Sequence, residues 1–171
     1  MDSEQLKTCI IEPTLQYLEY DNKLYKGRIL NRSAVKLLLL TAAIESDMGH
    51  FIEQTVMCAS NNGGMGIYQI EELTLSWVLK RSYKYPLSKA LELKFKIPTS
   101  EFINYPRNII GNLFYQTAIA RLIYWYKTAD TLPDVDDNEG MWLYYKKWWN
   151  SSEGKATKEQ FFRKGKKYGI I

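Results

Sequence analysis

The segment from Ala34 to Ile44 is the most apolar stretch of the chain and constrains the fold more than any other feature. Placed on a helix, its apolar residues cover nearly every side, so no face of that helix prefers water. Asn31-Arg32-Ser33 stands before it and supplies a helix cap. The stretch is interrupted by Lys36 and is about half as long as the roughly 20 residues of a membrane span. We therefore predict a buried central helix over residues 34–47 and no membrane span.

Helical patterns also dominate the rest of the chain. The further predicted helices cover Asp2–Tyr20, Glu71–Arg81, Ser88–Phe95, Arg107–Thr128, Asn138–Asn150 and Thr157–Tyr168. Pro13 is expected to split or kink the first of these helices, because proline lacks the N–H that a helix interior needs. Loops are predicted at Asp21–Lys23, at Lys26–Gly27 and over Ser60–Gly66, where most residues tolerate a positive φ.

No run of residues alternates convincingly between apolar and polar side chains, as a half-buried strand would. At most, Gly66–Ile70 could pair briefly. The predicted fold class is therefore all-α, or α with a very small β element.

The length of 171 residues, with 46% hydrophobic residues, is enough for one substantial core and too short for two comfortable domains. The charged fraction of 25% and the lack of low-complexity tracts are typical of a globular protein. We predict a single domain over residues 1–171, with a motif-bearing core at about residues 34–155 and a basic C-terminal helix at 156–171.

Cysteine and histidine are too sparse for a metal site. Cys9 and Cys58 are far apart and have no second pair or nearby histidines, so two reduced, buried thiols are expected. His50 is the only histidine. The sequence predicts no metal and no cofactor.

Charge is distributed unevenly along the chain. The eight Lys/Arg residues between Met141 and Ile171 stand against two acids, whereas Asp130–Gly140 carries five acids and no base. A basic end of this kind suits a polyanion, either nucleic acid or an anionic wall polymer. A solvated helix face with lysines for solubility explains it at least as well, so nucleic acid is an unfavoured partner that stays open.

Glu45 stands near the end of the apolar segment, directly after Ala42-Ala43-Ile44. A carboxyl group held in an apolar wall has a raised pKa and can act as a general acid near neutral pH. Taken alone, a glutamate at a helix end is more often an exposed surface residue. Its sequence context decides between the two interpretations.

Glu45-Ser46 is followed some twenty residues later by Gly66-Ile67-Tyr68-Gln69-Ile70 and then by Thr74. This order resembles the lytic transglycosylase family of the goose-type lysozyme superfamily, in which a Glu-Ser pair ends the catalytic helix and a Gly-Leu-Met-Gln-Ile type segment lines the opposite side of the cleft. Two later landmarks agree in order. Pro106–Gly111 is similar to the family's Asn-Ile-x-x-Gly, and Trp149-Asn150 with Gly154 is similar to its Tyr-Asn-x-Gly. The resemblance covers about residues 34–155.

Three departures from the family pattern stand out. Trp149 occupies the place of the usual tyrosine, Tyr68 replaces the usual methionine, and the gap from Thr128 to Asn138 is longer and more acidic. In the family that tyrosine contacts the catalytic glutamate. Tyr144 or Tyr145, one helical turn earlier, is the candidate substitute.

The resemblance implies a lysozyme-like domain with a substrate cleft that cleaves peptidoglycan glycan strands. Glycoside cleavage ordinarily uses two carboxyl groups, whereas a lytic transglycosylase uses one. Glu45 would protonate the oxygen between N-acetylmuramic acid and N-acetylglucosamine, and then take the proton of the muramic C6 hydroxyl as a 1,6-anhydro ring closes. Asp47 and Glu53 are the nearest second acids, and both are more simply explained as solvated residues after the helix end.

The same resemblance supplies a set of substrate-binding residues: Ser46, Gly66, Tyr68, Gln69, Trp149 and Asn150. Ser46 would bind sugar or orient Glu45, and Gln69 would offer its amide to an N-acetyl group or a hydroxyl. Gly64 and Gly66 would let the backbone approach the sugar chain. The alternatives are a Ser46 hydroxyl bonded back to a helix carbonyl and an exposed Gln69. In the aromatic run 142–149, Trp149 is assigned to the cleft and the other aromatic side chains to packing.

Met1–Gln5 is acidic and no secretory signal follows it, so the chain is expected to stay in the cytoplasm of the producing cell. The run Trp148–Thr157 and the basic segment after it are similar in style to small bacteriophage transglycosylases. Such an enzyme reaches the periplasm or cell wall from the virion, together with other virion proteins, or crosses with a holin at lysis. Two other functions stay open: a hydrolytic lysozyme of the same fold, and a catalytically degenerate virion structural or adaptor protein.

Overall fold

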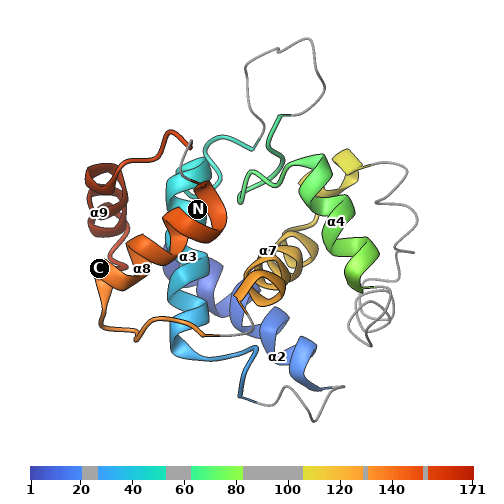
Figure 1. Ribbon diagram of the computed structural model, residues 1–171, viewed down its shortest axis with the longest axis horizontal. Helices are drawn as coiled ribbons and strands as arrows, with labels where there is room; N and C mark the ends of the chain where they lie inside the picture. Colours follow the sequence, from blue (N-terminus) through green and yellow to red (C-terminus); the bar gives the residue numbers. More distant parts are fainter. Residues whose placement is uncertain (21–26, 53–62, 83–105, 129–130, 152–153) are drawn as a thin grey trace.

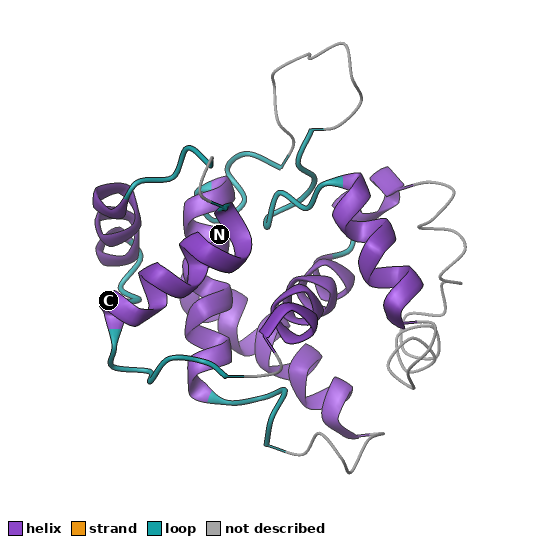
Figure 2. Ribbon diagram, viewed as in Figure 1, coloured by secondary structure: helices purple, strands orange, loops and turns teal. Residues whose placement is uncertain are grey.

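The computed structural model describes residues 1–20, 27–52, 63–82, 106–128, 131–151 and 154–171 (Figure 1). Its elements are α1 (Ser3–Gln5), η1 (Leu6–Ile11), α2 (Glu12–Tyr20), α3 (Arg32–Ser46), α4 (Glu72–Ser82), η3 (Pro106–Gly111), α7 (Leu113–Thr128), α8 (Asn138–Tyr145), η4 (Lys146–Asn150) and α9 (Lys158–Lys167). Within these ranges the chain forms helices joined by loops and no strand, and a single antiparallel bridge pairs Met65 with Ile70 (Figure 2). The all-α prediction, with at most a very small β element, is confirmed for this part of the chain.

The apolar segment forms the central helix, as predicted. The Asn31 side chain caps α3 by accepting a hydrogen bond of 2.8 Å from the Ala34 N–H. Nearly every residue of the helix between its first and last turns is buried, because α3 packs against η1, α7, α8 and α9. The helix ends at Asp47, which adopts the left-handed conformation with φ 54°. The chain therefore turns sharply just after Glu45 and Ser46.

The second buried helix, α7, differs from its prediction. A single helix was expected over Arg107–Thr128, whereas η3 is a 3-10 helix and α7 begins only at Leu113. Asn112 lies between them, and its Oδ1 accepts a hydrogen bond of 2.9 Å from the Tyr115 N–H. An asparagine that caps a helix has a non-helical backbone, so a new helix starts there.

Two helical stretches contain π-helical turns. At the N-terminus the helix runs from Ser3 to Tyr20 without interruption, and it changes from π to α geometry just before Pro13. Proline has no N–H to offer, so a change of hydrogen-bond pattern at this point accommodates it. Near the other end of the chain, Asn138–Asn150 is helical as predicted, but its last five residues form the π-helix η4.

The remaining predicted helices that fall within the described residues agree with the structure to within a residue or two at each end. α4 and α9 match their predictions, and Thr157 begins α9 with a capping box to Gln160. Cys9 is exposed, which corrects the prediction of a buried thiol. Ser88–Phe95, Asp21–Lys23, Lys26, residues 60–62 and Cys58 lie outside the described residues.

No described helix is both long enough and apolar enough to cross a membrane.

Candidate active site

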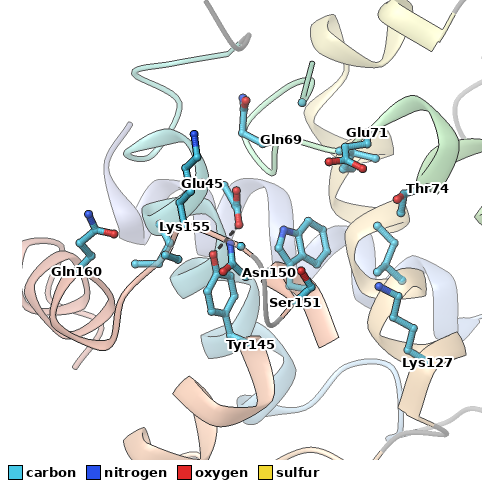
Figure 3. A pocket seen from close by; sticks show the side chains of 17 residues that line it. Glu45, Gln69, Glu71, Thr74, Lys127, Tyr145, Asn150, Ser151, Lys155 and Gln160 are labelled. Atoms are coloured by element: carbon cyan, nitrogen blue, oxygen red, sulfur yellow. Dashed lines mark hydrogen bonds between the residues drawn. The ribbon is translucent and has the colours of Figure 1, made fainter. Parts of the chain in front are cut away.

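A cavity of about 700 Å³ opens beside the C-terminal end of α3, and Glu45 lies on its surface (Figure 3). We call it the Glu45 pocket. One side is the turn wall, formed by residues 64–71, and the opposite side is the tyrosine wall, formed by residues 145–151 and 154–156. Thr74 of α4, Lys127 of α7 and Gln160 of α9 complete the rim. Five separate stretches of the chain thus meet around one carboxyl group.

Glu45 is held in that pocket by hydrogen bonds from the tyrosine wall. Its Oε1 accepts a hydrogen bond of 2.6 Å from the Tyr145 hydroxyl, and the Trp149 side chain donates a further hydrogen bond. Burial raises the pKa of Glu45 to about 7, although both of these hydrogen bonds and the positive charge of Lys164 act to lower it. The charge of Glu71 adds to the rise. A raised pKa lets the carboxyl group hold a proton near neutral pH, as a general acid requires.

Tyr145, and not Tyr144, is the tyrosine that reaches the carboxyl. Tyr144 is buried elsewhere, with its ring centroid 5.7 Å from that of Tyr124. The Tyr145 side chain is buried, and its hydroxyl reaches Glu45. Figure 3 shows the two side chains pointing toward each other. The sequence left these two tyrosines as alternatives, and the geometry selects Tyr145.

Ser46 does not face the pocket, contrary to its predicted contact with substrate. The side chain is fully buried, and its hydroxyl lies 2.6 Å from the Ile67 carbonyl and 3.1 Å from the Ala42 carbonyl. It also accepts a hydrogen bond of 2.8 Å from the Gly49 N–H. The bond back to a helix carbonyl is the alternative that the sequence offered. Ser46 ties the end of α3 to the turn wall and so fixes the backbone that carries Glu45.

Gly66 also has a structural role in place of the predicted approach to sugar. It is buried, with φ 72°, and a Cβ at this position would overlap the side-chain amide of Gln116. The Gln116 Oε1 accepts a hydrogen bond of 2.7 Å from the next N–H, that of Ile67. Glycine is needed here because a buried helix side chain from α7 occupies the space where a side chain would go.

Tyr68 lies beneath the pocket and not on its surface, which corrects its assignment as a substrate contact. The ring is fully buried, and its hydroxyl lies 3.2 Å from Thr117 Oγ1. Burial raises the pKa of Tyr68, so the hydroxyl stays neutral. Its ring centroid lies 6.5 Å from that of Trp149. Tyr68 thus supports the tryptophan of the opposite wall from below.

Of the six predicted substrate-binding residues, Gln69, Trp149 and Asn150 line the pocket, and so does Gly64, which was expected to let the backbone approach the sugar. The Gln69 amide nitrogen donates to the carbonyls of Gly66 at 2.8 Å and Phe51 at 3.2 Å, so any contact with a ligand falls to the amide oxygen. Trp149 is partly exposed and packs on Tyr124 at a centroid distance of 5.2 Å. An indole with one open face suits the apolar face of a sugar ring.

Sequence reasoning missed three charged residues that line the pocket: Glu71, Lys127 and Lys155. Glu71 lies exposed at the end of the turn wall, one residue after the segment that resembled the family motif. Lys127 of α7 donates a hydrogen bond of 2.8 Å to the Trp148 carbonyl, and burial lowers the pKa of this lysine. Position next to a recognised motif was the only signal for Glu71. Lys127 left none, because it stands at the end of an otherwise apolar helix.

Of the two acids considered beside Glu45, Asp47 does not line the pocket. Asp47 points to α9, where it pairs with Lys167 at 2.8 Å and with Lys164 at 3.9 Å. Glu53 lies outside the described residues. Among the residues that the structure describes, no cluster of three or more His, Cys, Asp or Glu side chains has the arrangement of a metal site.

No protein family, curated protein or solved structure matches the chain. The resemblance to lytic transglycosylases therefore stays a prediction from the sequence motifs. The geometry adds to it an acid of raised pKa in a polar pocket, with a phenol hydroxyl and an indole beside it.

Proposed function

We propose that the chain is a peptidoglycan lytic transglycosylase, with Glu45 as its catalytic acid and base. The observation that carries the proposal is the protonatable carboxyl group of Glu45, whose pKa is raised to about 7 inside a cavity of about 700 Å³. A pocket of this size accommodates a small part of a polymer and leaves the rest of a glycan strand to run outside it.

In the proposed reaction the glycan strand lies across the pocket with the bond between N-acetylmuramic acid and N-acetylglucosamine beside Glu45. The protonated carboxyl gives its proton to the leaving glycosidic oxygen as the C1–O bond breaks. The resulting carboxylate then takes the proton of the muramic C6 hydroxyl, whose oxygen bonds to C1 and closes the 1,6-anhydro ring. The proton that Glu45 lost is thereby restored, and no water is consumed.

Tyr145 and Trp149 assist the first half of that cycle, in which Glu45 gives up its proton. Their hydrogen bonds to Glu45 lower its pKa, which means that they stabilise the carboxylate formed after proton donation. Gln69 and Asn150 are the proposed polar contacts to sugar, because both line the pocket. In this proposal Ser46, Gly66 and Tyr68 hold the walls of the pocket in place and do not contact the sugar.

Purified protein incubated with peptidoglycan, followed by mass spectrometry of the released muropeptides, tests the proposal. We expect products with anhydro ends, which are lighter by one water than reducing ends. Glu45→Gln should lower the rate by about 1,000-fold while its circular dichroism spectrum stays that of the parent. Full activity in this variant would refute the role of Glu45.

Glu71 favours a second candidate, the hydrolytic lysozyme. This exposed carboxylate lines the same pocket and is near enough for its charge to raise the pKa of Glu45. A second carboxylate could activate a water molecule in place of the muramic hydroxyl. Reducing ends in the muropeptide assay, lost in a Glu71→Gln variant, would decide for hydrolysis.

A protein with no activity on any peptidoglycan, and unchanged in behaviour by Glu45→Gln, would instead be an adaptor or structural protein of a virion. For the active enzyme we propose delivery to the cell wall from a virion or at lysis. Binding of DNA by the basic C-terminal helix, the unfavoured alternative, would weaken steeply with salt.

A further inference from the structure

The hydrogen bonds on the tyrosine wall do not end at Tyr145. Asn150, four residues after Lys146 in η4, makes a side-chain hydrogen bond to Tyr145. Burial and the charge of Glu45 raise the pKa of the phenol, and the bond from Asn150 opposes that rise, so the amide N–H donates to the phenol oxygen. The other end of the amide, Asn150 Oδ1, accepts a hydrogen bond of 2.7 Å from Lys146 Nζ. Glu45, Tyr145 and Asn150 lie next to one another in Figure 3.

Lys146 is itself held in place by the backbone beyond the pocket. Its Nζ lies 2.6 Å from the Gly154 carbonyl and 3.2 Å from the Ala156 carbonyl. With Asn150 Oδ1, these make three acceptors for the three protons of an ammonium group. The side chain is half-buried, and a Cβ on Gly154 would overlap Asn150. A lysine bound on all three of its donors is fixed in position, unlike a solvated lysine.

The hydrogen bonds that lead from Lys146 through Asn150 and Tyr145 to Glu45 form one row, and every donor in this row points toward Glu45. The ammonium donates to the amide oxygen, the amide donates to the phenol, and the phenol donates to the carboxyl. A donor that is polarised by a cation behind it gives a stronger hydrogen bond to an anion in front of it. The row therefore favours the ionised form of Glu45 over its protonated form.

We infer that Lys146 is a positioning residue for the proposed reaction, which acts through Asn150 and Tyr145 to stabilise the carboxylate of Glu45 after it has given up its proton. This inference rests on the proposed function for its role in catalysis. The effect on the carboxyl itself does not depend on which reaction the pocket performs.

The other groups that face Glu45 are Trp149 of η4, Lys164 of α9 and Glu71 at the end of the turn wall. Lys164 bonds the Ile44 carbonyl at 2.9 Å, so it acts on the carboxyl through space. None of these three groups is a link between Lys146 and Glu45.

The test is a titration of Glu45 by its side-chain carboxyl ¹³C signal, assigned by its loss in Glu45→Gln. In Lys146→Gln, which keeps an amide donor but removes the charge, we expect the midpoint to rise by about half a pH unit. Lys147→Gln is the matched control, because it removes the same charge from an exposed neighbour that lies over the Trp148 ring. Its midpoint should stay at the parental value. Equal shifts in both variants would show a general charge effect and overturn the inference, as would no shift in a folded Lys146→Gln.

A double-variant cycle tests the route. If the effect passes through Asn150, then Lys146→Gln should cause no further rise in an Asn150→Ala background. A full additional rise would overturn the relay. If Lys146→Gln alone does not fold, Asn150→Ala is titrated by itself. An unchanged Glu45 midpoint in that variant would also overturn the relay.

Kinetics separate positioning from simple support of the fold. We expect Lys146→Gln to lower kcat by about 5-fold with KM unchanged, and to move the alkaline limit of activity to higher pH, whereas Lys146→Arg restores most of the loss. A lower kcat with an unmoved pH profile would mean that Lys146 only holds the backbone. If the parent protein has no activity, the proposed function fails, but the carboxyl titration still decides whether the row exists.

Discussion

The two walls of the Glu45 pocket use their side chains in different ways. On the turn wall, Gly66, Tyr68 and the neighbouring Ser46 are buried, and their bonds go to other parts of the protein. On the tyrosine wall, Tyr145 and Trp149 make their hydrogen bonds to Glu45 itself. The turn wall fixes the position of the backbone, whereas the tyrosine wall donates hydrogen bonds that lower the pKa of the carboxyl against the effect of burial.

This difference explains how a short motif can be recognised without its residues touching a substrate. A turn that needs a positive φ at Gly66 and a close approach of Gln116 restricts the residue type very strictly. Hydrogen bonds to a carboxyl group are less demanding, because a donor can reach the same atom from more than one helical position. The tyrosine at 145, one turn before Trp149, shows that freedom.

The largest effect that we predict tests the burial of the carboxyl between the walls. The pKa of Glu45 is about 7 in the folded protein, above its ordinary value in an unfolded chain. Between those two pKa values the folded state holds the proton that the unfolded state has lost, so the wild type loses stability as pH rises from about 4.5 to 7. The loss amounts to about 3 kcal/mol. Glu45→Gln cannot titrate and should not show it.

Urea denaturation of both proteins at pH 4 and pH 8 measures this difference. The free energy of unfolding of Glu45→Gln, relative to the wild type, should be higher at pH 8 than at pH 4 by that amount. A constant difference between the two proteins at both pH values would mean that the carboxyl is solvated and that neither wall excludes water from it.

Gly66→Ala tests whether the turn wall acts through its backbone. The alanine would be strained by its positive φ and would also overlap Gln116, so we expect a loss of about 2 to 3 kcal/mol in the free energy of unfolding. Gly27→Ala is the matched control, since Gly27 has φ 73° but no atom within 4 Å of an added Cβ. It should cost only about 1 kcal/mol. Equal losses in the two variants would remove the close approach of Gln116 from the explanation.

Much of the fold could be predicted because it depends on local patterns. The apolar run of α3, its cap at Asn31 and the capping box of α9 are visible in the sequence, and each appears in the structure. The 3-10 start before α7 was missed because Asn112 reads equally well as a helix residue or as a cap. The π turns in η1 and η4 were missed because the spacing of apolar residues does not distinguish them from α-helix over one turn.

The candidate site was harder to predict, because its members come from distant stretches. Glu45 was found from its unusual position and from the motif around it. Whether Ser46 and Tyr68 face inward or outward depends on which way the turn wall packs, and no spacing rule supplies that. Lys127 and Lys146 are held at the site by hydrogen bonds to backbone carbonyls, those of Trp148 and Gly154. The sequence alone does not reveal such bonds, so both residues look like surface lysines.

Tyr145→Phe tests the chemistry of the tyrosine wall. The phenylalanine fills the same space but cannot donate to Glu45, so the carboxylate loses a hydrogen bond and its pKa should rise further. We expect kcat to fall by about 10-fold with little change in KM. Tyr144→Phe is the control, because the ring of Tyr144 packs on Tyr124 and Tyr144 is not among the groups that shift the pKa of Glu45. A larger loss from Tyr144→Phe than from Tyr145→Phe would reverse the assignment of the two tyrosines.

The smallest effect concerns Gln69, the polar side chain of the motif segment that lines the pocket. Gln69 has φ 49°, a conformation that glycine adopts freely. Gln69→Gly therefore removes the side chain without adding backbone strain, although it also removes the bonds to the Gly66 and Phe51 carbonyls. If the amide oxygen only helps to bind the glycan strand, KM should rise by about 3-fold with kcat unchanged. A fall in kcat as large as that of Tyr145→Phe, at unchanged stability, would show that the turn wall also takes part in the chemistry.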